Sequence, residues 1–377
     1  MNRYILIPSF IFILLPVTGQ DSLRFSGQLS SWLNVNSGNE MPVWAGTRYI
    51  PQLNIGYDGR GKGKFDTELS LNIHGAAGLN PFDSLYLSGR IKPYRAWVRY
   101  STDQLEIRLG LQKINFGSAS ILRPLMWFDQ VDPRDPLKLT DGVWGLLGRY
   151  YFLNNANIWL WGLYGNKDPR GWEFAKTNKD IPEFGGRIQL PIPSGEAALT
   201  YNFRKVDLQK VRPLDPYYGK IRENKLGFDI KLDIVVGLWL EGSWVNKNAE
   251  LATLNNQEIL NAGFDYTFGL GNGLYFIFEQ LIMSYDERPF RFEDRMSFSS
   301  LSLSYPVSIF DNLSGIIYYD WKNNKTYNFV NWQRQFKNLT LYVIGYLNPK
   351  NYNIPSQGSE QNLFSGKGIQ LMLVFNH

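Results

Sequence analysis

The sequence predicts an all-β chain that closes into a transmembrane, antiparallel up-and-down β-barrel of roughly 16 or 18 strands. Three observations support this prediction: an N-terminal export signal, strand-like alternation along the whole chain, and a composition poor in charge but rich in aromatic residues. Because lipid cannot satisfy the backbone of an open strand edge, an exported chain that crosses a membrane by strands must close them into a barrel.

Residues 1–19 have the pattern of a secretory signal peptide. Arg3 gives a short positive region, residues 5–15 form an apolar core, and residues 17–19 are of modest size, as a cleavage site requires. We expect cleavage after this segment, which leaves residues 20–377 as a single outer-membrane barrel domain. The mature part has no apolar run close to the length of about 18 residues that a spanning helix needs.

Alternation of apolar and polar residues with a period of two recurs from one end of the chain to the other. In residues 64–74 the odd positions are mostly apolar and the even positions are charged or polar, and residues 104–111 and 225–234 repeat the pattern. A helix would give a period near 3.6, so these segments predict strands with one face in an apolar medium.

Further strands are expected throughout the mature chain. An outer-membrane strand needs about 9–11 residues, whereas strands in soluble proteins usually have about 5–6. The segment lengths therefore favour a membrane barrel over a soluble β-sandwich or propeller. The expected strands lie at 23–35, 45–58, 91–101, 142–153, 156–165, 183–192, 196–206, 236–247, 257–269, 273–285, 295–305, 313–322, 326–335, 338–348 and 367–375.

The links between these segments fall into a short and a long class, as expected for the two rims of a barrel. Tight links at 58–61, 153–155 and 269–273 are predicted to lie on the periplasmic side. The longer links are predicted to be external or inward-folded loops. They are residues 113–141, 166–182, 207–221, 286–294 and 349–366.

Composition excludes several classes of function. Charged residues are 19% of the chain and aromatic residues 15%, whereas a soluble globular protein carries about 25% charged residues. The chain has no cysteine and two histidines, so disulfides, thiol nucleophiles and zinc–thiolate sites are impossible. The basic residues are scattered singly despite a net charge of +5, which is unlike a nucleic-acid-binding surface. No metal or cofactor is expected.

The polar face of the strands is predicted to line the lumen. Mixed charge of this density is costly in a dry core and costs little in a water-filled channel, so the pattern favours a pore. The alternative is an interior filled by paired charges, with no open path. The expected lining residues are Arg48, Lys64, Asp66, Glu68, Arg95, Arg99, Glu106, Arg108, Lys225, Asp229, Lys231, Asp233, Glu241 and Glu279.

The long link at 113–141 is the most unusual segment, because it combines charged residues, aromatic residues and three stiffening prolines. Folded inward, it would narrow the pore, and its charges would set the ion preference. We expect a mild anion preference. The alternative is an external loop closed by its own salt bridges. The candidate constriction residues are Arg95, Arg99 and Arg108 on the wall, with Arg123, Asp129, Asp132, Arg134 and Asp135 on the loop.

This region also resembles a known family. The run at 108–112, the Asn-Phe-Gly-Ser segment at 115–118, and the pairs Asp132-Pro133 and Asp135-Pro136 resemble alginate-export-like and other porin-like bacterial outer-membrane barrels. The resemblance covers about 35 residues and implies passive conduction of a small or oligomeric solute. It departs at Leu111, where the family often has a basic residue. The segment 367–375 is similar to the closing strand that barrel-assembly machinery recognises.

Together these observations predict a passive diffusion porin in the outer membrane of a Gram-negative bacterium. Its expected partners are outer-membrane lipid, the barrel-assembly machinery, and a small hydrophilic solute or oligosaccharide. One rival is an outer-membrane enzyme, for which His74 is the only histidine base within a strand; we do not expect catalysis. The other rival is a non-conducting barrel that binds polysaccharide or assists secretion or assembly.

Overall fold

The computed structural model describes residues 20–37, 41–59, 63–80, 83–208, 220–249, 251–350 and 363–377. Apart from one 3-10 turn, η2 (Ala252–Leu254), the regular elements in these residues are β-strands. No helix among them is long and apolar enough to cross a bilayer. The strands are β1 (Gln20–Asn36), β2 (Val43–Asp58), β3 (Lys64–Asn80), β4 (Ser84–Ser101), β5 (Leu105–Gln112), β6 (Val143–Tyr151), β7 (Asn157–Leu163), β8 (Lys176–Thr177), β9 (Glu183–Ile192), β10 (Gly195–Asp207), β11 (Ile221–Asp233), β12 (Gly237–Lys247), β13 (Asn256–Phe268), β14 (Leu274–Asp286), β15 (Met296–Pro306), β16 (Asp311–Asp320), β17 (Lys325–Gln335), β18 (Leu339–Leu347) and β19 (Lys367–Asn376).

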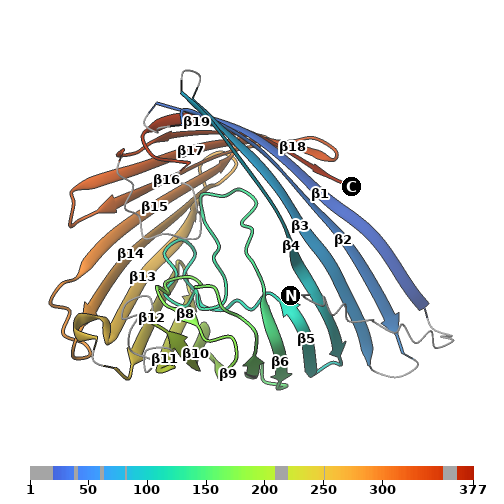
Figure 1. Ribbon diagram of the computed structural model, residues 1–377, viewed down its shortest axis with the longest axis vertical. Coiled ribbons are helices and arrows are strands. Elements are labelled where there is room, and N and C mark those ends of the chain that lie inside the picture. The colour runs from blue at the N-terminus through green and yellow to red at the C-terminus, as the bar shows by residue number, and fades with distance from the viewer. Residues whose placement is uncertain are drawn as a thin grey trace, which may run out of the picture.

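The sheet closes on itself into an antiparallel barrel (Figure 1). Each strand pairs with its neighbour in sequence, and β1 pairs both with β2 and with β19. The two-residue β8 pairs only with β10 and is not one of the strands of the ring, so the wall has 18 strands. This confirms the predicted fold class, and each predicted segment overlaps one strand of the wall.

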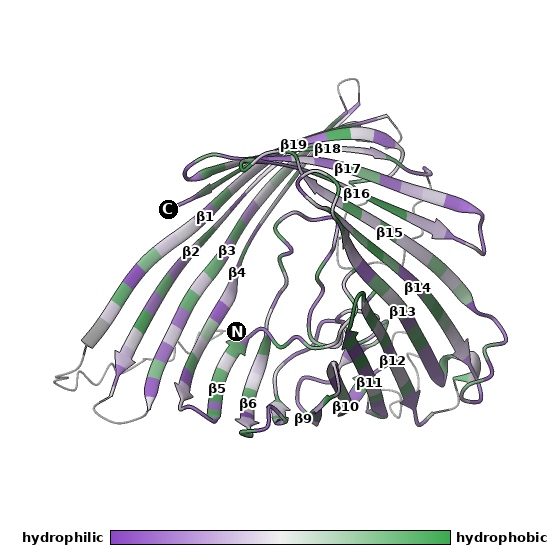
Figure 2. Cartoon of the chain, turned by 180° about the vertical axis from the view of Figure 1, so that it is seen from behind, coloured by the Kyte–Doolittle hydropathy of each residue, from purple (hydrophilic) through white to green (hydrophobic). Residues whose placement is uncertain are grey.

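Polar and apolar side chains largely alternate across the wall, as Figure 2 shows by hydropathy on β1 to β4. On β3, Leu69 and Leu71 are 41% and 44% exposed, whereas Ser70 and Asn72, which alternate with them, are buried. Elsewhere in the wall some apolar side chains, such as Leu281 and Phe298, face inward and are buried, but on these strands apolar residues mostly face outward and polar residues inward. That arrangement suits a wall with hydrocarbon outside.

Two strands extend beyond their predicted ends, because small residues hide the alternation there. β3 continues through residues 75–78, which read Gly-Ala-Ala-Gly, and β4 begins seven residues before the predicted start. At Gly78 an added Cβ would lie 2.8 Å from the Trp44 ring. The small side chain therefore makes room for an inward-facing, buried tryptophan, and the hydrophobic pattern is lost for a packing reason.

The links lie on two rims of opposite character. Links 59–63, 152–156 and 269–273 share one rim with the two ends of the barrel domain, here called the short-turn rim. The strand ends that border the five long links predicted from the sequence lie on the other, here called the long-loop rim. The predicted separation of short and long links is confirmed. The predicted signal peptide, residues 1–19, lies outside the described residues.

Candidate functional site

The interior of the barrel is occupied by the link between β5 and β6, residues 113–142, here called the inward loop. Figure 1 and Figure 2 both show it running inside the wall between β4 and β14. Most of its apolar residues are buried, including Ile114, Leu122, Leu125 and Phe128 at 1% exposure or less. Of the two predicted arrangements, external or inward-folded, the structure has the inward one.

One buried carboxylate of β14 binds the loop backbone. Glu279 faces inward and is fully buried. Its Oε1 accepts a hydrogen bond from the Ser120 amide at 2.6 Å, and its Oε2 accepts one from the Leu122 amide at 2.5 Å. The Ile121 amide lies between them, 3.1 Å from Oε1. Consecutive amides turned toward one carboxylate form an anion-binding concavity, so the loop satisfies a charge that β14 could not bury alone.

A second carboxylate, on β12, binds the loop in the same way. Oε2 of Glu241, also fully buried, accepts hydrogen bonds from the Ser118 and Ala119 amides at 2.7 and 2.9 Å, and Oε1 accepts one from Leu125 at 2.7 Å. Gly117 makes this approach possible. Its φ is +103° and a Cβ there would lie 2.6 Å from the carboxylate, so the backbone needs glycine both for conformation and for space.

The link between β7 and β9, residues 164–182, fills the neighbouring part of the interior and is here called the second loop. Its Glu173 lies in a buried charge cluster with Arg204 of β10 and with Glu223 and Lys225 of β11. Arg204 binds Glu173 at 2.6 Å and Glu223 at 2.5 Å. Although burial opposes the charged form, Arg204, Lys225 and Arg170 hold the pKa of Glu173 below its ordinary value.

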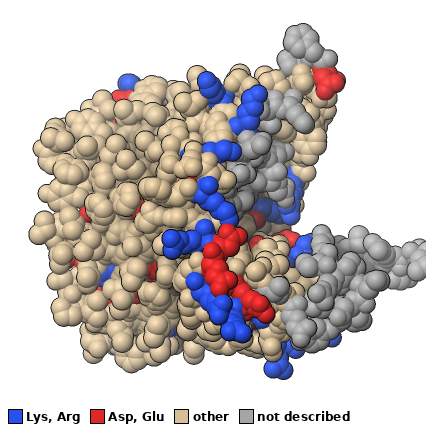
Figure 3. Space-filling view, turned by 90° about the vertical axis from the view of Figure 1, so that its left-hand side faces the viewer, with Lys and Arg blue, Asp and Glu red and all other residues tan. Residues whose placement is uncertain are grey.

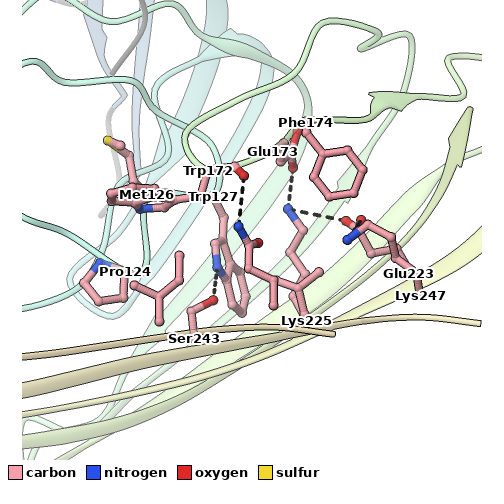
Figure 4. A pocket seen from close by; sticks show the side chains of 13 residues that line it. Pro124, Met126, Trp127, Trp172, Glu173, Phe174, Glu223, Lys225, Ser243 and Lys247 are labelled. Carbon is pink, nitrogen blue, oxygen red and sulfur yellow. Dashed lines mark hydrogen bonds and ion pairs between the residues drawn. The ribbon is translucent and has the colours of Figure 1, made fainter. Parts of the chain in front are cut away.

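The two loops and the strands β11 to β13 meet closely, as Figure 4 shows. Trp127 Nε1 donates to Ser243 Oγ at 3.0 Å, and Gln257 Nε2 donates to the Trp172 carbonyl at 3.2 Å. The cavity left between them is about 10 Å³, which holds about one water molecule. This side of the interior is filled by protein.

The predicted constriction residues on the inward loop form local pairs. Arg123 and Asp129 bind each other at 2.7 Å, and their side chains are 9% and 1% exposed. Arg134 and Asp132 bind at 2.5 Å. Asp135 stands apart and accepts a hydrogen bond from the Leu137 amide at 3.0 Å, and burial raises its pKa above the ordinary value. Pairing and burial leave little of their charge directed at the lumen.

The predicted wall residues differ among themselves. Arg95 is buried and donates to the Thr140 carbonyl at 2.9 Å, so it holds the end of the inward loop. Arg99 binds Asp66 at 2.9 Å and remains 31% exposed. Arg108 lies 3.1 Å from Glu106, stacks over Trp97 with its guanidinium 4.6 Å from the ring centroid, and is 15% exposed. Arg99 and Arg108 therefore keep contact with water.

These two arginines belong to a larger cationic surface on β4 to β6, here called the basic wall. The strand register directs one acid and several cations inward from these three strands. The acid is Glu106. The cations are Arg90, Lys92, Arg95, Arg99, Arg108 and Arg149.

Comparison with solved structures identifies porins as similar folds. OccD3 (OpdP) of Pseudomonas aeruginosa matches at 10% identity with a TM-score of 0.57, over 95% of this chain and 92% of that one. OccAB1 of Acinetobacter baumannii matches at 8% identity with a TM-score of 0.52, over 94% and 95%. The chain has a porin-like barrel fold.

A third porin-like barrel, an anion-selective porin from Comamonas acidovorans, matches at 12% identity with a TM-score of 0.50, over 95% of this chain and 100% of that one. At such identities the similarity shows the fold alone. No family model matches the sequence. No curated protein matches it either.

In this porin-like barrel, Glu241 and Glu279 hold the inward loop by accepting hydrogen bonds from its backbone amides, an arrangement here called the clasp. The sequence analysis did not predict this role and identified both residues only as lining residues. The sequence signal that could have identified this role is that each is an isolated acid facing inward from a largely apolar strand. His74, the histidine considered for catalysis, stacks on Trp32 with the ring centroids 5.5 Å apart. The described residues contain no group of His, Asp and Glu side chains arranged to hold a metal ion.

Proposed function

We propose that this chain is an outer-membrane porin of a Gram-negative bacterium, a passive diffusion channel for small hydrophilic solutes with a mild anion preference. The observation that supports it is the unequal filling of the interior. Protein covers the side formed by β10 to β14, whereas Arg99, Arg108 and Arg149 of the basic wall keep 31%, 15% and 16% of their side chains exposed.

The proposed path runs between the basic wall and the inward loop. Solutes would be excluded by size, because the loop narrows the cross-section. Anions would be favoured, because partly exposed guanidinium groups attract them without binding them tightly enough to stop conduction. The short-turn rim would face the periplasm, as short turns do in outer-membrane barrels.

The solute class is proposed from the inward loop. Its resemblance to alginate-export-like barrels includes Gly117, which the clasp with Glu241 requires. Trp97, stacked with Arg99 and Arg108, offers an aromatic face beside cations. These features support anionic oligosaccharides as the first solutes to test, beside simple small anions.

Export and assembly complete the proposal. Residues 1–19 would direct secretion and be removed. The outward residues Leu371, Leu373 and Phe375 of β19 are 43%, 42% and 41% exposed, and they would be read by the barrel-assembly machinery. Mass spectrometry of the mature protein should find an N-terminus at Gln20.

Single-channel recording in a planar lipid bilayer tests the function. We expect stable open steps, and a reversal potential under a potassium chloride gradient that indicates preference for chloride. Strong cation selectivity would contradict the anion preference alone. A folded barrel that never conducts would favour the rival function, a binding or assembly barrel, for which the filling of the interior by two loops is the supporting observation.

A further inference from the structure

We propose that the outer surface of β14 to β16 carries a binding site for the phosphate-bearing headgroup of a membrane lipid, in the leaflet on the long-loop side. The proposal rests on the membrane-embedded barrel proposed above and adds a ligand on its outside. It begins from a set of polar residues on a face that should meet lipid.

The outward residues of β14 and β15 change from apolar to polar along the strands. Phe276 pairs with Leu303 and Phe278 with Leu301, but the next outward pairs are Gln280 with Ser299 and Ile282 with Ser297. The Gln280 amide donates to Ser297 Oγ at 2.7 Å, and Ser299 donates back to Gln280 at 2.5 Å. Polar side chains are costly against hydrocarbon, so this part of the wall faces another medium.

The position of the bilayer can be estimated from the opposite rim. Several turn residues of the short-turn rim are apolar and exposed, among them Leu153 at 93%, Val235 at 84%, Leu270 at 60% and Ile309 at 95%. Apolar turn tips place this rim at the periplasmic edge of the apolar part of the membrane. A strand crosses the hydrocarbon in about ten residues, and about ten residues back from Ile309 along β15 is Ser299.

The polar residues therefore lie at the headgroup level of the other leaflet. Trp321 supports this placement, because its exposed indole donates to Ser299 Oγ at 2.8 Å, and tryptophan favours the membrane interface. Figure 3 shows a broad surface with few charges, bordered by a band of Lys, Arg, Asp and Glu. Headgroups would meet the wall along such a border.

An open hollow of about 490 Å³ lies at this level, lined by Ile282, Arg295, Ser297, Trp321 and Lys322. Arg295 is exposed and makes no ion pair with any residue in the described parts of the chain. Lys322 binds Asp294 at 2.6 Å, but both side chains are exposed, at 47% and 79%. Exposed pairs of this kind are weak, so the ammonium can turn toward a phosphate.

The chemistry of the lining selects a lipid. Arg295 and Lys322 supply positive charge, and Ser297 supplies a hydroxyl, all suited to phosphate oxygens. Ile282 and the Trp321 ring lie beside them on the outer wall, where they would contact the apolar part of the same molecule. A free anion would use the first group and leave the second without a role.

Native mass spectrometry of the whole barrel in detergent tests the site, with phosphatidylglycerol and phosphatidylcholine as probes. We expect wild-type protein to retain phosphatidylglycerol about tenfold more tightly than phosphatidylcholine, as two basic residues near an anionic headgroup imply. The double variant Arg295→Gln with Lys322→Gln should reduce this preference to about twofold or less. The matched control is Arg334→Gln with Lys337→Gln, two exposed basic residues at the short-turn rim, and it should keep the preference.

Equal retention of the two lipids by wild-type protein would overturn the site, and so would a preference that survives in the double variant. Inorganic phosphate that displaces the lipid at matched concentration would instead assign the hollow to free anions and overturn the lipid. Channel recordings on the same preparations separate the two proposals. A barrel that conducts without headgroup preference contradicts this site alone, whereas a barrel that fails to enter bilayers contradicts the porin as well.

Discussion

The two sides of the barrel interior carry similar residues in opposite environments. On the basic wall, Arg99 and Arg108 face acids across a partly hydrated surface. On β10 to β14, Arg204, Glu241 and Glu279 are almost fully excluded from water, and the two loops supply most of their partners. Strand alternation brings charge inward on both sides, but the loops decide whether water or protein solvates it.

The largest difference between the two sides should appear in stability when Arg204 is replaced by methionine. Glu173 and Glu223 would lose their shared guanidinium while still buried. Removing one partner of a buried ion pair costs about 3–5 kcal/mol. We expect a correspondingly lower urea midpoint for unfolding in detergent.

Arg99→Met is the matched control on the basic wall. Its ion pair with Asp66 is about one-third exposed, and such pairs contribute about 1 kcal/mol or less. Similar losses in the two variants would mean that water, rather than loop protein, solvates both sides.

Glu279→Gln should have the next largest effect and should act on conduction. The new amide group would present donors to the amides of Ser120, Ile121 and Leu122, which now donate to the carboxylate. Each buried donor left without an acceptor costs about 1–3 kcal/mol, so the inward loop should detach from β14. We expect larger single-channel conductance and passage of larger neutral polymers.

Glu68→Gln is the control for the clasp, because Glu68 faces the lumen from β3 and hydrogen-bonds Ser70 of its own strand rather than the loop. Its size cut-off should match that of the wild type. An unchanged cut-off in Glu279→Gln would show that the clasp does not hold the aperture.

Neutralising the basic wall should alter selectivity and leave stability nearly unchanged. In Arg99→Gln with Arg108→Gln, passing anions would lose two nearby charges. A unit charge at about 4 Å changes an ion's energy by about 1 kcal/mol in water, so the chloride-to-potassium permeability ratio should fall several-fold. Reversal potentials measure this directly. The same ratio after Arg334→Gln, a charge on the outer face, should not move.

The smallest expected effect is that of salt concentration on ion selectivity. The Debye length falls from about 10 Å at 0.1 M to about 3 Å at 1 M, so hydrated charges of the basic wall should lose most of their influence. We expect the anion preference of the wild type to shrink with rising salt. Selectivity that is independent of salt would point to buried charge as its source.

The wall was predictable from the sequence because its signal is local. Each strand shows its own alternation, and the exceptions at residues 75–78 and at the start of β4 arise where small residues remove the contrast between faces. Closure of the sheet into a barrel was predicted because lipid cannot satisfy the backbone of an open strand edge, and no particular residue was needed for that prediction. The fold class could therefore be predicted without knowing which residues contact each other in the folded chain.

The interior was less predictable because its contacts use groups that carry no sequence signature. Every residue except proline has a backbone N–H group, so the donors at Ser118, Ser120 and Leu122 could not be distinguished from others. The pairing of Arg123 with Asp129 is a fold-dependent contact between residues that the sequence shows only as nearby charges. Lining residues could be identified, but not which of them would be covered.

The clasps of Glu241 and Glu279 hold main-chain atoms and, apart from Gly117, place few demands on side-chain identity. The position of the inward loop therefore depends little on the side chains that the loop carries. Residues facing the open side could be exchanged for others of different size or charge while the loop stays where it is. A barrel built this way can be refitted for a new solute by point substitution, with no redesign of the wall that supports it.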